Sequence, residues 1–195
     1  MKTSEAIKKR YSCRSYSEKK VNKKTILELL RLANWAPSAS NKQNRQFVVI
    51  SDRNDREWLA EMNHQEHIGE APVVVLVTYQ RGIYFKNKED YEKGLGDWQM
   101  RPSGEVNDLE GMWEKWGIQD AAAAVENLML AATERGLATC WLGIMDFEGV
   151  KRKFGVPRDF EPVCLVTLGY VKPAHSQAAA RQRKPIDKLV HWGKW

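Results

Sequence analysis

The stretch from Gln119 to Arg135 constrains the fold of this 195-residue chain more than any other segment. It predicts one long helix that ends at Gly136, because glycine readily adopts the left-handed backbone angles found just past a helix end. Apolar residues occupy most of its circumference and include Ala121–Val125 and Leu128–Ala132. A helix of this kind is buried on several sides. We therefore expect one side of it to contact a second subunit.

Strands and shorter helices alternate along the rest of the chain. Residues Pro72–Thr78 are β-branched and apolar on both faces, as in a central strand of a covered sheet. The segments expected to be strands are 46–51, 72–78, 139–143 and 162–170. The segments expected to be shorter helices are 4–10, 23–35, 52–63 and 147–154. Asn22 and Asp146 are expected to cap two of these helices.

Composition limits the class of protein. A hydrophobic content of 43% supports a real core, and a net charge of +6 favours anionic ligands. The basic residues are scattered and no nucleic-acid motif stands out, so nucleic-acid binding remains only a less favoured alternative. No apolar run approaches the roughly 20 residues that span a membrane, and the N-terminus does not resemble a signal peptide. We expect a cytoplasmic protein that binds neither membrane nor nucleic acid.

Cysteine and histidine spacing argues against a metal site. The three cysteines form no CxxC or Cys/His pattern, and Cys140 and Cys164 lie in apolar runs typical of a core. His64 and His67 could share a helix face, but only Glu70 lies at a useful spacing to complete a ligand set. We expect no metal, and no side-chain catalyst is evident either. That suits an enzyme whose reactive atom belongs to a cofactor.

The segment Lys9–Tyr16 is suited to anion capture. Arg10 and Arg14 flank the hydroxyl of Ser12. A guanidinium binds phosphate oxygens through two parallel hydrogen bonds, and a hydroxyl or a backbone N–H can add a third. Taken alone, the segment is more typical of a solvated basic turn.

Two other segments follow this one along the chain: Ala36–Gln43, with the sequence APSASNKQ, and Arg181–Pro185, with the sequence RQRKP. Together the three segments resemble the nitroreductase family of FMN-dependent flavoenzymes. The resemblance runs from about Ser4 to Trp192 and omits roughly residues 82–116.

The resemblance implies an α+β fold with a mixed, mostly antiparallel central sheet flanked by helices. It also implies an intertwined homodimer with two FMN sites at the subunit interface. The whole chain, 1–195, would be a single domain of this type. An aromatic-rich insertion would occupy about 82–117, and a C-terminal arm about 174–195.

The resemblance also assigns residues to FMN. In the first motif, FMN would be bound by the side chains of Arg10, Ser12 and Arg14 and by the backbone of Tyr11. The phosphate would also meet Arg181 and Arg183. A second chain would contribute the loop residues Pro37, Ser38, Ala39, Asn41 and Gln43. Backbone N–H groups near flavin N5 would come from Leu142, Gly143 and Ile144, and the amide of Asn63 or Gln65 would reach the pyrimidine ring.

The sequence departs from the family pattern at two places. Many relatives have Gln-Pro-Trp where this chain has Gln43-Asn44-Arg45, and the family often has an acidic residue where Gly143 stands. Without the rest of the pattern, the loop after Pro37 is also consistent with a simple helix stop, and the C-terminal arginines with a solvated basic tail. The insertion contains Trp98, Trp113 and Trp116, which we expect to line the acceptor pocket as a lid or wall, with core packing as the alternative.

The function implied by the resemblance is a ping-pong oxidoreductase. Hydride would pass from NADH or NADPH through flavin N5 to a small electron-poor acceptor of the nitroaromatic or quinone type. A reductive dehalogenase or a flavin oxidase on the same scaffold is the nearest alternative. A non-enzymatic flavin- or nucleotide-binding protein is a further one.

Overall fold

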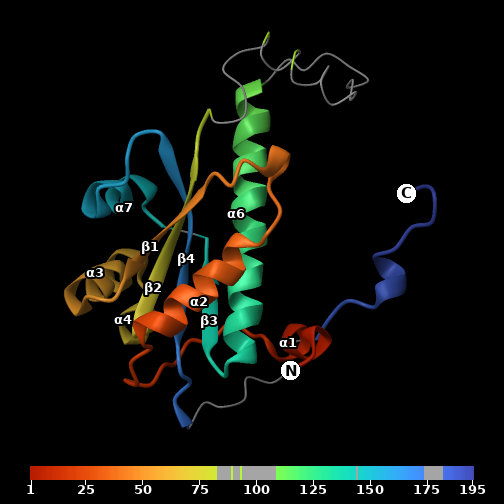
Figure 1. Cartoon of the computed structure of the whole chain (residues 1–195). Coiled ribbons are helices and arrows are strands. Elements are labelled where there is room, and N and C mark those ends of the chain that lie inside the picture. Colours follow the sequence, from red (N-terminus) through yellow and green to blue (C-terminus); the bar gives the residue numbers. More distant parts are fainter. Residues whose placement is uncertain (83–88, 90–92, 94–108, 144, 174–181) are drawn as a thin grey trace.

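A four-stranded sheet forms the centre of the protein (Figure 1). The computed structural model describes residues 1–82, 89, 93, 109–143, 145–173 and 182–195. The strands are β1 (Arg45–Ile50), β2 (Val73–Gln80), β3 (Ala138–Leu142) and β4 (Phe160–Gly169), in the spatial order β1-β2-β4-β3. Each pairs antiparallel with its neighbours. The expected α+β class and the antiparallel pairing are confirmed, and the parallel pairing in the described residues is one isolated bridge to β3, outside the four strands.

Helices cover both faces of the sheet. Figure 1 shows α2 (Lys23–Asn34) and α6 (Leu109–Glu134) on one side, and α3 (Arg53–Asn63), α4 (His67–Glu70) and α7 (Phe147–Phe154) on the other. The short helix α1 (Thr3–Lys9) lies near one end of α6.

The alternation of side chains along β2 explains this layering. Val73, Val75 and Val77 belong to the core cluster that contains the buried residues of α2 and α6, whereas Val74 and Leu76 belong to the cluster beneath α3 and α7. Successive residues of a strand point to opposite faces, so an apolar run supplies both cores at once. The prediction of a central, doubly covered strand is confirmed.

The predicted caps are present. The side chain of Asn22 accepts a hydrogen bond from the N–H of Thr25 at the start of α2, and the side chain of Asp146 accepts one from Gly149 at the start of α7. Asp52 does the same for α3, so it precedes that helix as its cap rather than forming its first residue. These contacts satisfy backbone donors that have no partner within the helix.

The helix α6 begins earlier than the sequence suggested. It starts at Leu109 rather than Gln119, so residues 109–117 of the expected irregular insertion are helical. This first part mixes tryptophans with glutamate, lysine and glycine, and its pattern hides the helical period. Farther along, Ala121, Val125 and Leu128 are buried in the core, as expected.

The C-terminal residues 182–195 lie apart from the sheet and its helices, beyond α1 (Figure 1). They contain a short 3₁₀ turn, η3 (Ile186–Lys188), and the large apolar side chains of Ile186 and Trp192 are exposed. None of the helices in the described part of the chain is both long enough and apolar enough to cross a bilayer.

Close packing between α6 and β2 gives a testable constraint. A Cβ atom built on Gly117 would lie 2.2 Å from Cδ2 of the Tyr79 ring. Gly117→Ala should therefore destabilise the protein by about 1–3 kcal/mol, because this steric conflict outweighs the gain of roughly 1 kcal/mol from better helix propensity. Urea unfolding measures the difference. Gly69→Ala is the matched control, since its Cβ would meet Cβ of Ala60 at an ordinary 3.5 Å. An unchanged stability for Gly117→Ala would contradict the packing.

Candidate functional site

The predicted anion-binding segment runs alongside strand β3. Ser12 forms a parallel bridge with Thr139, and the N–H of Cys13 donates a hydrogen bond to the carbonyl of Thr139 at 2.9 Å. Tyr16 anchors the other end, because its buried hydroxyl lies 2.7 Å from Oγ1 of Thr167. The backbone of residues 12–16 is therefore fixed against the sheet, and the side chains around it have a defined place.

Three of the predicted phosphate ligands act on Cys140, in the middle of β3. Burial raises the pKa of the Cys140 thiol, while the charges of Arg14 and Arg10 and a hydrogen bond with Ser12 act in the opposite direction. The charges of Arg10 and Arg14 therefore act at this part of the strand, beside Ser12. Arg10 and Ser12 are half-buried, whereas Arg14 is exposed and available to a ligand.

The histidine of helix α4 adds a buried polar group to this region. His67 is only 8% exposed, and burial together with the positive charge of Arg14 lowers its pKa, although Glu70 acts in the opposite direction. The imidazole is therefore neutral near pH 7. Its Nε2, like Oγ1 of the buried Thr139, has no hydrogen-bond partner among the residues that the structure describes. Buried polar atoms without partners are uncommon and point to a bound ligand or water.

Glu70 connects this helix to the anion-binding segment. Its carboxylate accepts a hydrogen bond from the N–H of Tyr16 at 3.1 Å and lies 3.0 Å from Nζ of Lys172. Burial by itself raises the pKa of Glu70, but the contacts with Lys172 and Tyr16 and the charge of His67 outweigh it and lower the pKa. The carboxylate thus holds three segments together as an anion.

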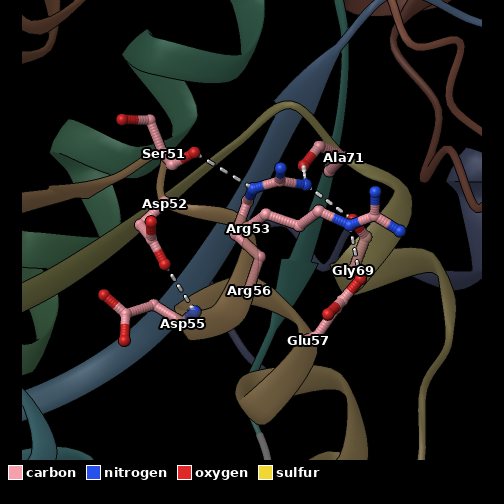
Figure 2. Close-up of polar contacts among 8 residues, drawn as sticks. All are labelled: Ser51, Asp52, Arg53, Asp55, Arg56, Glu57, Gly69 and Ala71. Carbon is pink, nitrogen blue, oxygen red and sulfur yellow. Dashed lines mark hydrogen bonds and ion pairs between the residues drawn. The ribbon is translucent and has the colours of Figure 1, made fainter.

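Arg56 fixes the segment that carries His67 (Figure 2). Its guanidinium donates to the carbonyls of Gly69 at 2.6 Å and Ala71 at 2.7 Å, and its Nε donates to the carbonyl of Ser51. Burial lowers the pKa of Arg56, but a guanidinium stays charged in proteins. The first turn of α3 therefore clamps the end of α4 through one cation.

The loop 37–43 has an unusual backbone. Ser40, Asn41 and Gln43 have positive φ angles of 54°, 52° and 50°. This left-handed region costs roughly 1–2 kcal/mol for a residue with a Cβ, and somewhat less for asparagine. The hydroxyl of Ser38 accepts a hydrogen bond from the N–H of Gln43 at 3.0 Å and closes the loop. Such strain persists only where other contacts enforce it.

Two buried charged residues enforce this conformation. Arg45 is 3% exposed, and its guanidinium donates to the carbonyls of Asn34 at 2.8 Å, Ala36 at 2.6 Å and Pro37 at 3.2 Å. Asp120 is 7% exposed, and its carboxylate accepts the N–H of Ala39 at 3.0 and 3.2 Å. Sequence reasoning missed both. The available signals were an arginine directly before the predicted strand 46–51, and an aspartate at the edge of the apolar part of α6.

The other predicted residues are scattered. Leu142 is buried at the end of β3, and Gly143 is exposed. A Cβ atom built on Gly143 would lie 4.0 Å from Nε1 of Trp141. Asn63 donates to the carbonyl of Leu59 at 2.7 Å, so one donor of its amide is used within α3. Arg183 is exposed on the C-terminal arm, and Gln65 is half-buried. Trp98, Ile144 and Arg181 lie outside the described residues.

A separate cleft of about 1150 Å³ opens between the start of α6, helix α7 and the first residues of β4. Trp113 forms part of its wall, together with Phe147 and Pro162, and Arg81, Lys151 and Glu161 supply charge. Trp116 is half-buried on the same helix but does not line this cleft. No group of three His, Cys, Asp or Glu side chains in the described part of the chain is placed to hold a metal ion.

Comparison with known proteins gives this arrangement a family. Residues 7–170 match the family described as the Nitroreductase family. The chain belongs to this family. It is therefore an oxidoreductase of the NAD(P)H-dependent nitroreductase type.

Individual relatives are distant but cover nearly the whole chain. The Bacillus subtilis protein YodC, provisionally named an NAD(P)H nitroreductase, is 29% identical over 97% of this chain and 98% of its own length. A 4-nitrobenzoate reductase of Nocardioides is 27% identical over 94% of this chain and 87% of its own. The crystal structure of YdfN from Bacillus subtilis, provisionally named a nitroreductase, superimposes with a TM-score of 0.81 at 25% identity and covers 97% of each chain.

The anionic state of Glu70 predicts a pH-dependent contribution to the stability of this nitroreductase-family protein. Because its pKa is lowered on folding, the stabilisation is present above its unfolded pKa of about 4.3 and is lost as pH falls through the folded value. Glu70→Gln should cost up to about 1 kcal/mol at pH 7, since the group is partly exposed and screened. Urea unfolding at pH 7 and pH 3 should show that cost shrinking as the pH falls. Glu66→Gln, an exposed neighbour, is the control, and a cost that grows at pH 3 would contradict the assignment.

Proposed function

We propose that this protein is an FMN-dependent oxidoreductase that transfers hydride from NAD(P)H to an electron-poor aromatic acceptor by a ping-pong mechanism. The observation that carries the proposal is the segment 10–14 fixed against β3, where Ser12 is bridged to Thr139 between Arg10 and Arg14, and where the charge of Arg14 acts on the buried His67. Two guanidinium groups and a hydroxyl suit a phosphate dianion. A neutral imidazole and the Thr139 hydroxyl, neither of which has a hydrogen-bond partner in the described part of the chain, suit the polar edge of a flavin or the ribityl chain.

The remaining assignments extend the same site. Arg183, with Arg181 beside it in sequence, would add positive charge at the phosphate from the C-terminal arm. The exposed backbone of Gly143 would approach N5, since glycine permits close approach. When bound, FMN supplies reversible hydride transfer at N5, and the protein contributes binding, orientation and a positive field. We assign no side chain as a proton donor, because water can supply the proton.

A homodimer is part of the proposal. Trp35 at the end of α2 is 84% exposed, and Leu27 and Leu32 of that helix are also exposed. The C-terminal arm adds further exposed apolar side chains, including Ile186 and Trp192. Exposed apolar surface on this scale favours contact with another subunit. A second copy of the chain would cover both surfaces and bring the loop 37–43 to the cofactor.

The acceptor is proposed to be a small nitroaromatic or quinone, by analogy with the 4-nitrobenzoate reductase relative. Within one chain Trp113 lines a cleft apart from the anion-binding segment, so it would form an aromatic wall for the acceptor only at the site of a second copy. A reductive dehalogenase or flavin oxidase would use the same cofactor site and differ only in the acceptor. Since NAD(P)H is regenerated in the cytoplasm, we place the enzyme there.

The deciding experiment is a visible absorption spectrum of the purified protein, reconstituted with FMN and then mixed with NADH or NADPH under anaerobic conditions. We expect flavin bands that bleach with at least one donor and return when a nitroaromatic compound or a quinone is added. Bands that never bleach would favour a flavin-binding protein without this activity. A protein that takes up no FMN would overturn the proposal.

The phosphate site predicts the effect of single substitutions. Arg14→Ala and Arg183→Ala should each weaken FMN binding about 10- to 100-fold, because a charge-assisted hydrogen bond contributes roughly 1.5–3 kcal/mol. Quenching of FMN fluorescence on titration measures the dissociation constant. Arg152→Ala, which removes an exposed arginine of α7, is the control and should leave the constant unchanged. Wild-type affinity in both variants would show that the phosphate lies elsewhere.

A further inference from the structure

The loop 37–43 lies far from the anion-binding segment of its own chain. Asp120 contacts the loop near the middle of α6, whereas Ser12 lies beside Thr139, just after that helix ends at Glu134. At a rise of about 1.5 Å per residue, Asp120 and Glu134 are roughly 20 Å apart along α6. In Figure 1 the loop after α2 lies beside the upper half of α6, and the first residues of the chain lie near its lower end.

We propose that Arg45 and Asp120 are positioning residues that hold the loop 37–43 in the conformation with which it completes the cofactor site of a second copy of this chain. The inference rests on the proposed function, since it assumes an FMN site in a homodimer. It adds two residues to that site and assigns each a task. Neither residue touches the cofactor.

Arg45 fixes the start of the loop. Its guanidinium donates hydrogen bonds to the carbonyls of Asn34, Ala36 and Pro37, where helix α2 ends and the loop begins. The last carbonyls of a helix lack partners within it and carry the negative end of the helix dipole, so a cation is favoured there. One side chain thereby sets the direction in which the chain leaves α2.

Asp120 fixes the middle of the loop. Both of its carboxylate oxygens lie within hydrogen-bonding distance of the N–H of Ala39, although the two residues are 81 positions apart in the sequence. The loop is thus tied to the buried central helix rather than only to its neighbours in the chain. Its tip remains exposed at Asn41 and Gln43, where the side-chain amides contact each other at 3.3 Å.

Buried charges and strained backbone together favour a functional role over a purely structural one. Apolar residues of similar size often stabilise a fold as well as buried ions do, and the more plausible benefit of the ions here is a unique conformation. Left-handed Ser40, Asn41 and Gln43 would relax in a free loop. A loop held ready in its binding conformation avoids an ordering cost when the ligand arrives.

The first test separates positioning from stability. Arg45→Met and Asp120→Leu, which keeps a similar size and removes both acceptor oxygens, should each weaken FMN binding at least tenfold. Arg45→Lys, which keeps the charge, should recover part of the loss. The dissociation constant of FMN is measured beside the melting temperature of the apoprotein and the dimer mass from light scattering. Arg53→Met, which removes an exposed arginine paired with Glu57, is the control. Variants that remain dimeric and bind FMN like the wild type would overturn the inference.

The second test asks which chain the loop serves. One affinity tag is placed on the Arg45→Met subunit and a different tag on the Arg14→Ala subunit. Mixed dimers are then isolated by two successive purifications, one on each tag. The Arg45→Met subunit retains its own phosphate residues and receives an intact loop from its partner. We therefore expect one site of wild-type affinity per mixed dimer, and none in either variant homodimer. If Arg45→Met fails to fold, Asp120→Leu, which keeps a similar size and removes both acceptor oxygens, takes its place in the mixture.

The outcomes are distinguishable from failure of the proposed function. Wild-type protein that takes up no FMN would refute the cofactor itself. Wild-type protein that binds FMN, with mixed dimers that recover no site, would show that the loop acts within its own chain and would refute only this inference. A monomeric wild-type holoprotein would refute it as well.

Discussion

The packing of α6 against the central strands β2 and β4 is the contact on which the other features depend. Val125 and Leu128 of the helix share one core with Val75 and Val166 of the strands. Burial of this apolar surface is the main stabilising contribution to such a core. The same helix positions two segments that lie far apart. One is the loop near Asp120, and the other is the start of β3, just beyond the C-terminal end of the helix.

The charged side chains that connect separate segments of this protein bind mainly backbone groups. Arg45 and Arg56 each bind several carbonyls, while Asp120 and Glu70 each accept a backbone N–H. Each contact joins a segment outside the sheet to a regular helix or strand. The apolar core alone would leave those segments weakly determined, since apolar contacts have little directional preference. The polar contacts therefore specify the site, and the apolar core supplies the stability that permits them.

Local patterns predicted the elements of the fold but not the contacts between its segments. The β-branched run 72–78 and the cap at Asn22 have local physical causes, and both expectations are confirmed. The predicted start of α6 was wrong because Trp113 and Trp116 lie among charged residues that obscure the helical period. The role of Arg45 depends on carbonyls brought close by the turn after α2, and that of Asp120 on a residue 81 positions away. His67 drew notice only as a possible metal ligand, because neither its burial nor the nearness of Arg14 is visible in sequence.

If the loop of one subunit completes the site of another, cofactor binding and dimerisation are linked. A ligand that binds only the dimer stabilises it by mass action, and dimer formation raises the affinity for the ligand by the same factor. The strain at Ser40, Asn41 and Gln43 belongs to this linkage, because the buried contacts of Arg45 and Asp120 offset it before any ligand binds. Weakening those contacts would therefore lower cofactor affinity and dimer stability together, while the apolar core around α6 would remain intact.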